Sequence, residues 1–578
     1  MLRRLWPYLK PYRGHFTAGI FCSGAEAVIE LLIPLVMAEI VDVGIRSGDA
    51  SHTVRMGALM IGMALVSLLF GMLSSYFSAY TGQSFGSAIR SAEYRHIQEF
   101  SFRNIEHFTT ASLITRLTGD INALQMAVMM SMRLLVRAPV MLLSALVLSL
   151  LISLQLSRVF LVAIPLLVVV VGILLSRVGP LFRKMQERTD DLNLSVQEDL
   201  TSIRVVKAFV REDHETEKFS RRNQALRSTS ETAFGRVVLT MPVMMLLIYG
   251  TIIAILWFGG HMVAGGTLEI GLLTTFITYV IQILTALMMI SMSLMMLTRS
   301  FACARRVIEV LDEVPDIQDD TAPADDSVQS GSIRFDHVFF KYNPDNTDWD
   351  LADIDLTIHS GETVGILGGT GSGKTTLVQL IPRLYEATQG RILVDGRDVR
   401  EHSLPALRDA CAMVLQKNTL FSGTIRENLL WGNENASEDE LWEVCRIACA
   451  DEFIRQMPKG LDTDLGQGGG NLSGGQKQRL CIARALLKHP KVLILDDSTS
   501  AVDMATDARL RAGLSHALQD ATKIIIAQRI ASVCEADRII VLDEGRIAAV
   551  GNHETLMQTS EIYQDVYRSQ QEGGRIHG

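Results

Sequence analysis

Apolar residues are concentrated in the first half of the chain, where they form six long stretches. Each stretch is close to the roughly 20 residues that a helix needs to cross a bilayer. We therefore predict six transmembrane helices. They lie at Phe16–Val41, Gly57–Tyr80, Leu134–Leu154, Val159–Leu175, Val237–Phe258 and Leu272–Leu297.

The polar connections between these stretches differ in length. About fifty residues separate the second stretch from the third and about sixty separate the fourth from the fifth, whereas Gln155–Arg158 alone joins the third to the fourth. Strong helix formers dominate both long connections, which predicts that the helices continue as rods beyond the membrane. We expect each pair of rods to end in a short cross-helix, near Ala111–Asn122 and near Thr201–Phe209.

Positive charge before the first stretch predicts the orientation. Arg3, Arg4, Lys10 and Arg13 precede it, and such an excess is typical of the cytoplasmic side. Six crossings then return the second half to the cytoplasm. No signal peptide is predicted, because the first apolar stretch is too long and no cleavage site follows it. We expect a multi-pass protein of the cell membrane, plasma or inner.

Charged residues inside the predicted spans need polar surroundings. Glu26 and Glu30 lie one helical turn apart in the first span, and two interpretations remain open. They form either a patch that attracts cations in a transport cavity or a hydrogen-bonded contact between helices. Arg133 and Arg137 begin the third span, where we expect them to face solvent or lipid headgroups.

Composition excludes some classes of function. The net charge of −9 argues against a nucleic-acid-binding protein. The seven cysteines are scattered without a CxxC pair, which indicates reduced thiols, and Cys445 with Cys449 indicates core packing better than a metal site. Methionines are frequent in the sixth span, which suits either an adaptable surface for apolar ligands or ordinary packing of a helix bundle.

A glycine-rich segment in the second half matches a P-loop. An apolar strand ending at Ile366-Leu367 precedes it and a helical stretch follows, as phosphate binding requires. Backbone N–H groups would surround the phosphates, Lys374 would reach the β- and γ-phosphates, and Thr375 would coordinate Mg²⁺. The predicted nucleotide-binding residues here are Gly368, Gly369, Thr370, Gly371, Ser372, Gly373, Lys374, Thr375 and Thr376.

A second apolar strand, Val492–Leu495, ends at Asp496. A carboxylate in this position is typical of the Walker B motif, which holds the magnesium shell. Between the two motifs lies Leu472-Ser473-Gly474-Gly475-Gln476. This segment resembles the signature sequence of ATP-binding cassette (ABC) proteins. With six spans on the same chain, the sequence resembles an ABC exporter half-transporter over essentially its whole length.

The resemblance implies a multidomain fold. An all-α transmembrane domain of six helices with long cytoplasmic extensions would occupy residues 1–300, followed by a linker at 301–330. An α/β P-loop nucleotide-binding domain with a helical subdomain would occupy residues 331–570, and a polar tail residues 571–578. The linker is also indicated by Asp319–Ser332, which is rich in Asp, Ser, Ala and Pro and has no apolar periodicity.

The resemblance also implies roles for three further residues. Tyr342 would stack on adenine, although a tyrosine buried in the domain core is the alternative. Gln416 would contact magnesium and the membrane domain, and Asp503 matches the D-loop aspartate. In this family two nucleotide-binding domains meet head to tail, so each ATP lies between the P-loop of one and the signature of the other. One chain would therefore need a second half-transporter.

The chain departs from the family pattern at two catalytic positions. Asp497 stands where a glutamate usually activates water, and its side chain is shorter by one methylene, roughly 1.5 Å. Gln528 replaces the switch histidine and cannot carry a proton at neutral pH. Gln467-Gly468 also replaces a Glu-Arg pair that commonly precedes the signature. These departures resemble the degenerate-site subunit of bacterial heterodimeric multidrug exporters.

The sequence therefore predicts one subunit of an ATP-driven exporter that uses ATP and Mg²⁺. Its expected partners are a second half-transporter in a heterodimer, membrane lipids and an amphipathic small molecule such as a drug. A carrier of lipid, peptide or siderophore, or a regulatory subunit gated by ATP, remains the alternative. The six spans exclude a soluble cassette protein.

Overall fold

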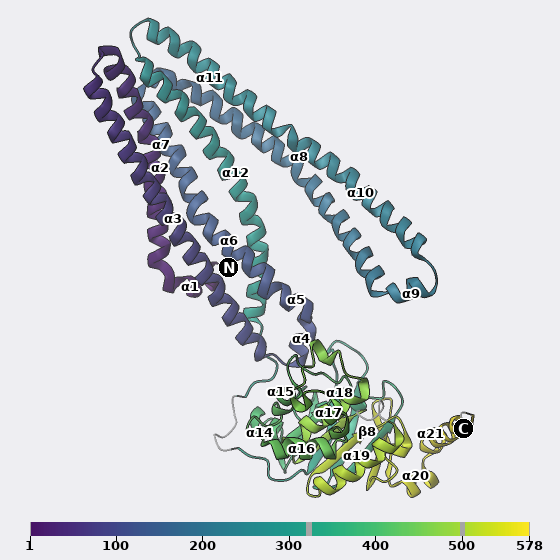
Figure 1. Cartoon of the computed structure of the whole chain (residues 1–578). Coiled ribbons are helices and arrows are strands. Elements are labelled where there is room, and N and C mark those ends of the chain that lie inside the picture. The colour runs from purple at the N-terminus through teal and green to yellow at the C-terminus, as the bar shows by residue number, and fades with distance from the viewer. Residues whose placement is uncertain (1, 320–325, 498–502, 577–578) are drawn as a thin grey trace. The chain divides into compact units, whose positions relative to one another are not determined.

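The computed structural model describes residues 2–319, 326–497 and 503–576 (Figure 1). The chain divides into two compact units. The first contains Met1–Gln98 and Thr110–Glu313, and the second contains Glu99–Thr109 and Val314–Gly578. The short segment Glu99–Thr109 thus belongs with the C-terminal unit, although it lies in the sequence between two helices of the first.

The first unit is entirely helical in its described residues. Its elements are α1 (Leu2–Leu9), η1 (Lys10–Tyr12), α2 (Arg13–Glu39), η2 (Ile40–Ile45), α3 (Ala50–Gln98), α5 (Thr110–Thr115), η3 (Arg116–Asp120), α6 (Ile121–Met130), η4 (Ser131–Leu135), α7 (Val136–Ile152), α8 (Leu154–Thr201), α9 (Ile203–Ala208), α10 (Glu212–Val238), α11 (Thr240–Ala264) and α12 (Ile270–Asp312).

The predicted spans fall in six of these helices, α2, α3, α7, α8, α11 and α12. Four helical stretches of the described chain are long and apolar enough to cross a membrane, and the apolar part of α8, Leu154–Val170, is shorter. The four are Ala50–Gln98, Thr110–Ile152, Glu212–Ala264 and Ile270–Ile290. The count of six crossings therefore stays a prediction.

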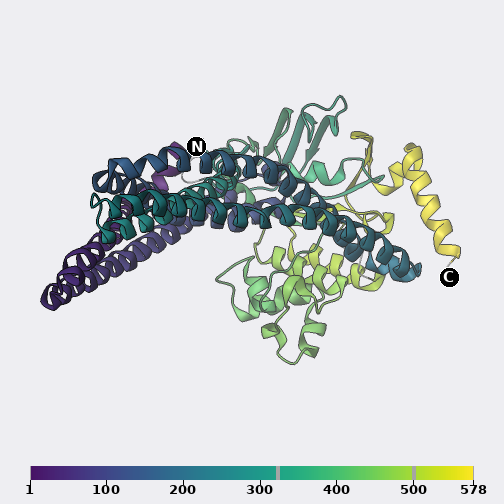
Figure 2. The same ribbon diagram turned by 90° about the horizontal axis from the view of Figure 1, so that it is seen from above.

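Helix α12 is fixed to η2 and to α2 by polar contacts. The Asp42 carboxylate accepts hydrogen bonds from the backbone N–H groups of Gly271 at 2.7 Å and Leu272 at 3.1 Å. These N–H groups lack partners within their own helix, because they belong to its first turn. The buried Tyr279 hydroxyl donates to Leu31 O at 2.8 Å. Helices α2 and α3 pack along each other, as do α8 and α10 (Figures 1 and 2).

Two carboxylates of α2 share one guanidinium of α7. Arg137 donates through Nη1 to Glu26 Oε1 at 2.7 Å and through Nη2 to Glu30 Oε2. The structure therefore supports the interpretation of Glu26 and Glu30 as a polar contact between helices. The expectation that Arg137 faces solvent or headgroups is wrong, because the two carboxylates on α2 hold its side chain. Arg133, one turn earlier, is exposed as expected.

We predict that Arg137→Leu destabilises the first unit by several kcal/mol. Removal of one partner leaves charges in the bundle without compensation, and breaking a buried ion pair costs roughly 3–5 kcal/mol, less where the groups are partly exposed. Arg133→Leu is the matched control and should change the melting temperature little. Thermal unfolding of both variants in detergent measures the difference, and equal melting temperatures would contradict the structural role of Arg137.

Glu93 is a buried carboxyl group near the end of α3, beyond the predicted span. It is fully buried, and neither carboxyl oxygen has a hydrogen-bond partner in the part of the chain that the structure describes. Burial, with a smaller contribution from the charge of Asp120, raises the pKa of Glu93 to about 7, although the charges of Arg116 and Arg90 oppose the rise. The folded protein therefore favours the protonated form of Glu93.

The stability of the first unit should consequently fall as pH rises. The folded-state pKa lies above the ordinary value, so the cost of ionising Glu93 is absent below about pH 4.5 and complete above about pH 7. One pKa unit corresponds to about 1.4 kcal/mol, which makes this cost about 3 kcal/mol. We expect Glu93→Gln to raise the melting temperature at pH 8 and to change it much less at pH 5. A pH-independent effect would show that ionisation of Glu93 is not the cause.

The structure confirms one predicted cross-helix and corrects the other. Helix α9 (Ile203–Ala208) lies within the predicted Thr201–Phe209. The first cross-helix is α4 (Phe102–Phe108), whereas Ala111–Asn122 begins the next long helix. A capping box formed by Ser101 and Asn104 starts α4, and Thr109, at a φ of 58°, ends it. These local signals separate α4 from the long helix that begins at Thr110.

Helix α4 is held within the second unit by side chains. Tyr385 Oη donates to Glu106 Oε1 at 2.8 Å, and the ring of Tyr385 meets that of Phe102 edge-on. Asn104 donates to Val314 O at 3.3 Å and accepts from the Asp316 N–H at 3.2 Å. These contacts explain why Glu99–Thr109 belongs to this unit.

The second unit contains two sheets and a group of helices. A four-stranded sheet has the order β2-β1-β4-β5, and a six-stranded sheet has the order β10-β9-β3-β8-β7-β6. In the larger sheet the strands from β9 to β6 are parallel, whereas β10 is antiparallel to β9. The strands are β1 (Ile333–Phe340), β2 (Leu351–Ile358), β3 (Thr363–Gly368), β4 (Gln389–Val394), β5 (Arg397–Asp398), β6 (Cys411–Val414), β7 (Val492–Asp496), β8 (Thr522–Ile526), β9 (Arg538–Asp543) and β10 (Arg546–Gly551).

The parallel strands read as continuous apolar runs, because helices cover both faces of such a sheet. All five residues of β7 and of β8 are buried. The helices of this unit are α13 (Lys374–Gln379), α14 (Leu404–Ala410), α15 (Ile425–Leu430), α16 (Glu438–Ile447), α17 (Asp451–Gln456), α18 (Gly474–Leu486), α19 (Met504–Ala517), α20 (His553–Thr559) and α21 (Glu561–Ile576), with short turns η5 (Gly460–Asp462), η6 (Gln467–Gly469) and η7 (Ile530–Ser532).

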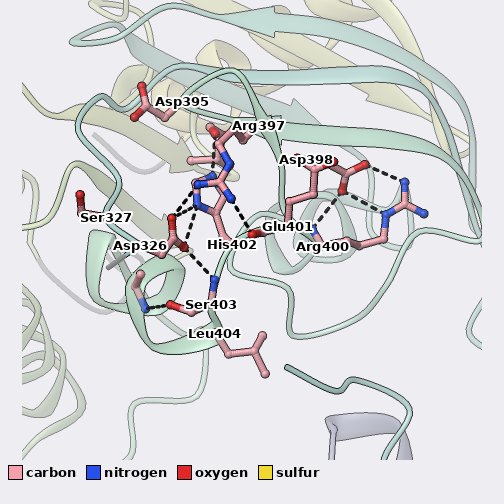
Figure 3. Close-up of polar contacts among 12 residues, drawn as sticks. Asp326, Ser327, Asp395, Arg397, Asp398, Arg400, Glu401, His402, Ser403 and Leu404 are labelled. Atoms are coloured by element: carbon pink, nitrogen blue, oxygen red, sulfur yellow. Dashed lines mark hydrogen bonds and ion pairs between the residues drawn. The ribbon is translucent and has the colours of Figure 1, made fainter. Parts of the chain in front are cut away.

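The end of the predicted linker is attached to this unit through Asp326 (Figure 3). Its carboxylate accepts from Arg397 Nη1 at 2.8 Å, from the Ser403 N–H at 2.7 Å and contacts His402 Nδ1 at 3.1 Å. Burial alone would raise the pKa of Asp326, but the hydrogen bonds from Ser403 and His402 and the charge of Arg397 hold it below its usual value. The linker therefore ends at a fixed point beside β5 and α14.

Candidate nucleotide-binding and hydrolysis site

The predicted site residues gather at one edge of the six-stranded sheet. Strand β3 runs into the P-loop, β7 ends at Asp496, and Gln528 and Gln416 follow β8 and β6. These four strands are parallel neighbours in the order β3-β8-β7-β6. Their carboxyl ends therefore point to the same edge, which is where open α/β sheets bind ligands.

Glycine is required at two positions of the P-loop. Gly373 precedes α13 with a φ of 89°, and a Cβ there would lie 2.7 Å from the Leu351 side chain. Gly368 follows β3, and a Cβ there would lie 2.2 Å from Leu542 O. Only a residue without a side chain fits both places. The glycines thus let the backbone turn closely over the end of β3 and into the helix.

Lys374 is held over this loop. Its ammonium donates to Gly369 O at 2.6 Å and to Gly368 O at 3.0 Å. Burial lowers the pKa of Lys374, whereas the charges of Asp496 and Asp497 oppose that change. A positive group beside backbone N–H groups is the arrangement that binds phosphates.

The residues present fit a magnesium ion that is bound together with phosphates. Thr375 Oγ1 donates to Asp496 Oδ1 at 3.1 Å, and the buried Asp496 Oδ2 has no hydrogen-bond partner among the described residues. Burial raises the pKa of Asp496, although the hydrogen bond from Thr375 opposes it. Among the residues described, no group of three or more His, Cys, Asp or Glu could hold a metal alone. Mg²⁺ commonly takes one or two protein oxygens and completes its shell with phosphates and water.

Asp497 and Gln528 meet directly. Gln528 Nε2 donates to Asp497 Oδ2 at 2.8 Å. Burial raises the pKa of Asp497, and hydrogen bonds from Gln416 and Gln528 oppose the rise. Asp497 has a left-handed backbone with a φ of 47°, and its N–H donates to Ile526 O at 3.1 Å. The structure thus brings Asp497, Gln528 and Gln416 together beside Asp496.

Tyr342 lies near the P-loop helix with part of its side chain accessible. Its hydroxyl is 3.0 Å from Thr376 Oγ1, and its ring meets that of Tyr385 edge-on at 5.1 Å. The residue is 36% exposed, which a tyrosine enclosed in the core would not be. Stacking of Tyr342 on a base stays a prediction, for which its ring is accessible.

The signature segment starts helix α18. Ser473 Oγ accepts from the Gln476 N–H at 3.3 Å, and Gln476 Oε1 accepts from the Ser473 N–H at 2.9 Å, which is a capping box. Leu472 is buried beneath it. Among the described contacts, Leu472–Gln476 makes no hydrogen bond to the P-loop of the same chain.

Asp503 and Gln467-Gly468 lie apart from the P-loop cluster. Asp503 caps α19 by accepting from the Thr506 N–H at 2.9 Å, whereas Ser500, Ala501 and Val502 of the predicted D-loop fall outside the described residues. Gly468 has a φ of 63°, and its carbonyl accepts from Lys477 Nζ at 2.9 Å. A glycine is favoured there by the backbone conformation.

Sequence reasoning missed two glutamines that support the catalytic pair. Gln478 of α18 is buried and donates to Asp497 O at 3.4 Å. Gln570 of α21 donates to Gln528 O at 2.7 Å and accepts from the Ile530 N–H at 2.9 Å. Gln478 follows the signature by two residues, which is a weak signal. The sequence gives no such signal for Gln570, because it is a polar residue at an exposed position of α21.

We predict that Gly373→Ala weakens ATP binding by more than tenfold, whereas Gly369→Ala changes it only a few-fold. Alanine at 373 would meet the Leu351 side chain and adopt a left-handed conformation that costs roughly 1–2 kcal/mol. A Cβ at Gly369 meets nothing within 4 Å. Titration of the purified chain with fluorescent ATP measures both affinities. Equal weakening by the two variants would contradict this account of the loop.

Comparison with known proteins covers both units. Residues 16–287 match the family described as ABC transporter transmembrane region, and residues 351–500 match the family described as ABC transporter. A solved structure titled as a bacterial Atm1-family ABC exporter with ATP bound superposes with a TM-score of 0.80 over 99% of this chain and 98% of that chain. It is 24% identical in sequence, so it shows the fold.

Curated relatives match along the whole length. An uncharacterized ABC transporter ATP-binding protein of Bacillus subtilis is 40% identical over 98% of each chain. An uncharacterized ABC transporter ATP-binding protein of Mycobacterium tuberculosis is 38% identical over 100% of each. A Staphylococcus aureus protein named as a putative multidrug export ATP-binding/permease protein is 31% identical over 99% of this chain and 100% of its own.

Proposed function

The chain belongs to the ABC transporter family, and from this premise we propose that it is the degenerate-site subunit of a heterodimeric multidrug exporter. It has an N-terminal membrane domain and a C-terminal ATPase domain, and ATP hydrolysis in this family is coupled to transport. Its ATPase domain binds ATP, generally with Mg²⁺. The subunit type, the substrate and the direction of transport are the proposed parts.

The hydrogen bond between Gln528 and Asp497 carries the proposal. A general base must accept a proton from the attacking water within hydrogen-bond reach. Asp497 directly follows β7, and one of its oxygens already accepts from the Gln528 amide at 2.8 Å. An amide can orient a phosphate oxygen by donating a hydrogen bond, but it cannot take up a proton. The pair therefore suits nucleotide binding better than hydrolysis.

The length of Asp497 supports the same conclusion. Its carboxylate ends roughly 1.5 Å short of the position that a glutamate reaches. Misplacement of a catalytic group by about 1 Å can lower a rate on the order of 100-fold. Gln416 and Gln528 both bond to the carboxylate, which further restrains it. We propose that ATP in this chain's own site is held through more than one transport cycle.

The signature segment is the part that would serve the partner. Leu472–Gln476 retains its sequence, and the capping box leaves the first backbone N–H groups of α18 oriented for an anion. In the proposed dimer these groups face the ATP on the partner's P-loop, where hydrolysis takes place. The partner's signature in turn completes the site of Lys374, Asp496 and Asp497.

The proposed substrate is an amphipathic small molecule such as a drug. The staphylococcal relative named for multidrug export supports this class. We further propose that the protein lies in the cell membrane with its N-terminus and ATPase domain in the cytoplasm. The positive charges of Arg3, Arg4, Lys10 and Arg13 support this orientation.

The ATPase activity of the purified chain tests whether its own site hydrolyses ATP poorly. We predict little phosphate release by the wild-type chain in detergent. Asp497→Glu should raise the rate only modestly, because Gln528 still limits the site, and Asp497→Glu combined with Gln528→His should raise it much further. Lys374→Ala is the control that removes nucleotide binding. Robust hydrolysis by the wild-type chain alone would overturn the proposal.

A further inference from the structure

The C-terminal helix α21 reaches the loop that carries Gln528. Gln570 Nε2 donates to Gln528 O at 2.7 Å, and Gln570 Oε1 accepts from the Ile530 N–H at 2.9 Å. One side chain therefore bonds to the backbone on both sides of Arg529. We call residues 528–530 the switch loop. These two bonds fix the path of its backbone.

Helix α21 is itself anchored close to this loop. Tyr563 is fully buried in the core of the unit, and its hydroxyl lies 2.7 Å from His553 Nδ1. The Tyr567 ring packs against His553 at a centroid distance of 5.5 Å. Because Tyr563, Tyr567 and Gln570 recur at intervals of four and three residues, they share one helical face. The docked face therefore ends at the switch loop.

The contacts continue from the switch loop to the catalytic carboxylate. The Gln528 side chain donates to Asp497 Oδ2 at 2.8 Å, and the Gln528 backbone carbonyl accepts from Gln570. Gln528 is therefore held both at its backbone and at the end of its side chain. The backbone position of Gln528 decides whether its amide can bond to Asp497 and also reach a γ-phosphate. A shift of the loop would change both.

We propose that Gln570 is a positioning residue for the site of this chain: through its two backbone hydrogen bonds it sets the Gln528 amide on Asp497 and toward the γ-phosphate of bound ATP. Docking of α21 and retention of ATP are thereby coupled. The proposal rests on the proposed function, because it takes Gln528 to be the residue that contacts the γ-phosphate.

Three isosteric or near-isosteric variants separate hydrogen bonding from packing. Gln570→Met keeps the length of the side chain and removes both hydrogen bonds. Gln570→Glu keeps the shape and an acceptor for the Ile530 N–H, but it places a carboxylate oxygen against Gln528 O. Gln571→Met is the control, because Gln571 lies next on the same helix and donates to Tyr567 Oη at 2.8 Å, and among the described hydrogen bonds it makes none to the switch loop.

Hydrogen–deuterium exchange of the full chain in detergent measures directly how well the backbone amides of the switch loop are protected. In Gln570→Met, which loses both hydrogen bonds, we expect roughly tenfold faster exchange in the peptide that contains 528–530, and in Gln570→Glu, which loses the bond to Gln528 O, a smaller increase. Exchange of the β7 peptide and the melting temperature should stay unchanged. Gln571→Met should match the wild type. Exchange that is unchanged in both Gln570 variants overturns the inference.

Dissociation of nucleotide tests the functional part. We expect ATP to leave Gln570→Met and Gln570→Glu several-fold faster than the wild type, measured by a chase with unlabelled ATP in the presence of Mg²⁺. ADP should leave all variants at the same rate, because it lacks the phosphate that Gln528 would contact. A merely structural defect would accelerate both nucleotides, and that result, or a wild-type rate for ATP in both Gln570 variants, overturns the inference.

These results are distinguishable from failure of the proposed function. Robust hydrolysis by the wild-type chain would refute the degenerate site, whereas the exchange of the switch loop does not depend on hydrolysis. Wild-type behaviour of Gln570→Glu together with a defect in Gln570→Met would show that the bond with the Ile530 N–H suffices and the bond to Gln528 O does not matter, and it would refute the inference that both bonds set the loop while leaving the degenerate site intact.

Discussion

The hydrogen bond from Thr375 to Asp496 joins two segments whose strands are not neighbours. The P-loop follows β3 and Asp496 ends β7, and β8 lies between these strands in the sheet. Any residue that follows β8 must therefore lie beside both the P-loop and the end of β7. Strand order alone thus places Gln528 next to Asp497. The chemistry at this edge depends on which side chains the chain supplies at positions that the topology has already fixed.

Burial at the same edge shapes the charges. It raises the pKa of Asp496 and of Asp497 and lowers that of Lys374, because removal from water disfavours each charged form. The opposite charges and hydrogen bonds nearby resist these shifts. A bound phosphate with its magnesium ion would add both negative and positive charge at this place. The ammonium of Lys374 and the carboxylates of Asp496 and Asp497 therefore suit an ionic ligand.

The sequence predicts best those features that a local backbone requirement imposes. The P-loop glycines, the apolar strand before Asp496 and the helix start at Ser473 are visible because each is needed within a few residues. The apolar stretches likewise predict helices by length alone, and all six fall in helices.

Features that depend on distant partners could not be predicted in this way. Arg137 meets Glu26 from 111 residues away, and Gln570 meets Gln528 from 42 residues away. Neither pairing leaves a periodicity or a motif. Helix α4 shows a related limit, since the capping box at Ser101 is local, but its attachment through Tyr385 and Glu106 spans 279 residues. Sequence patterns predict elements well, and they predict contacts between elements only where strand order dictates them.

The two residues that depart from the family pattern are physically coupled. Asp497 and Gln528 are in direct contact, so substitutions at the two positions are not expected to act independently. A glutamate at 497 would extend the carboxylate by a methylene into the space that the Gln528 amide now occupies. A histidine at 528 would present a ring to a carboxylate that is too short to meet it in the same geometry. The short acid and the amide therefore form a hydrogen-bonded pair whose geometry depends on both side chains. The signature segment Leu472–Gln476 retains its sequence, but its helix is joined to this pair, because Gln478 of α18 donates to Asp497 O at 3.4 Å.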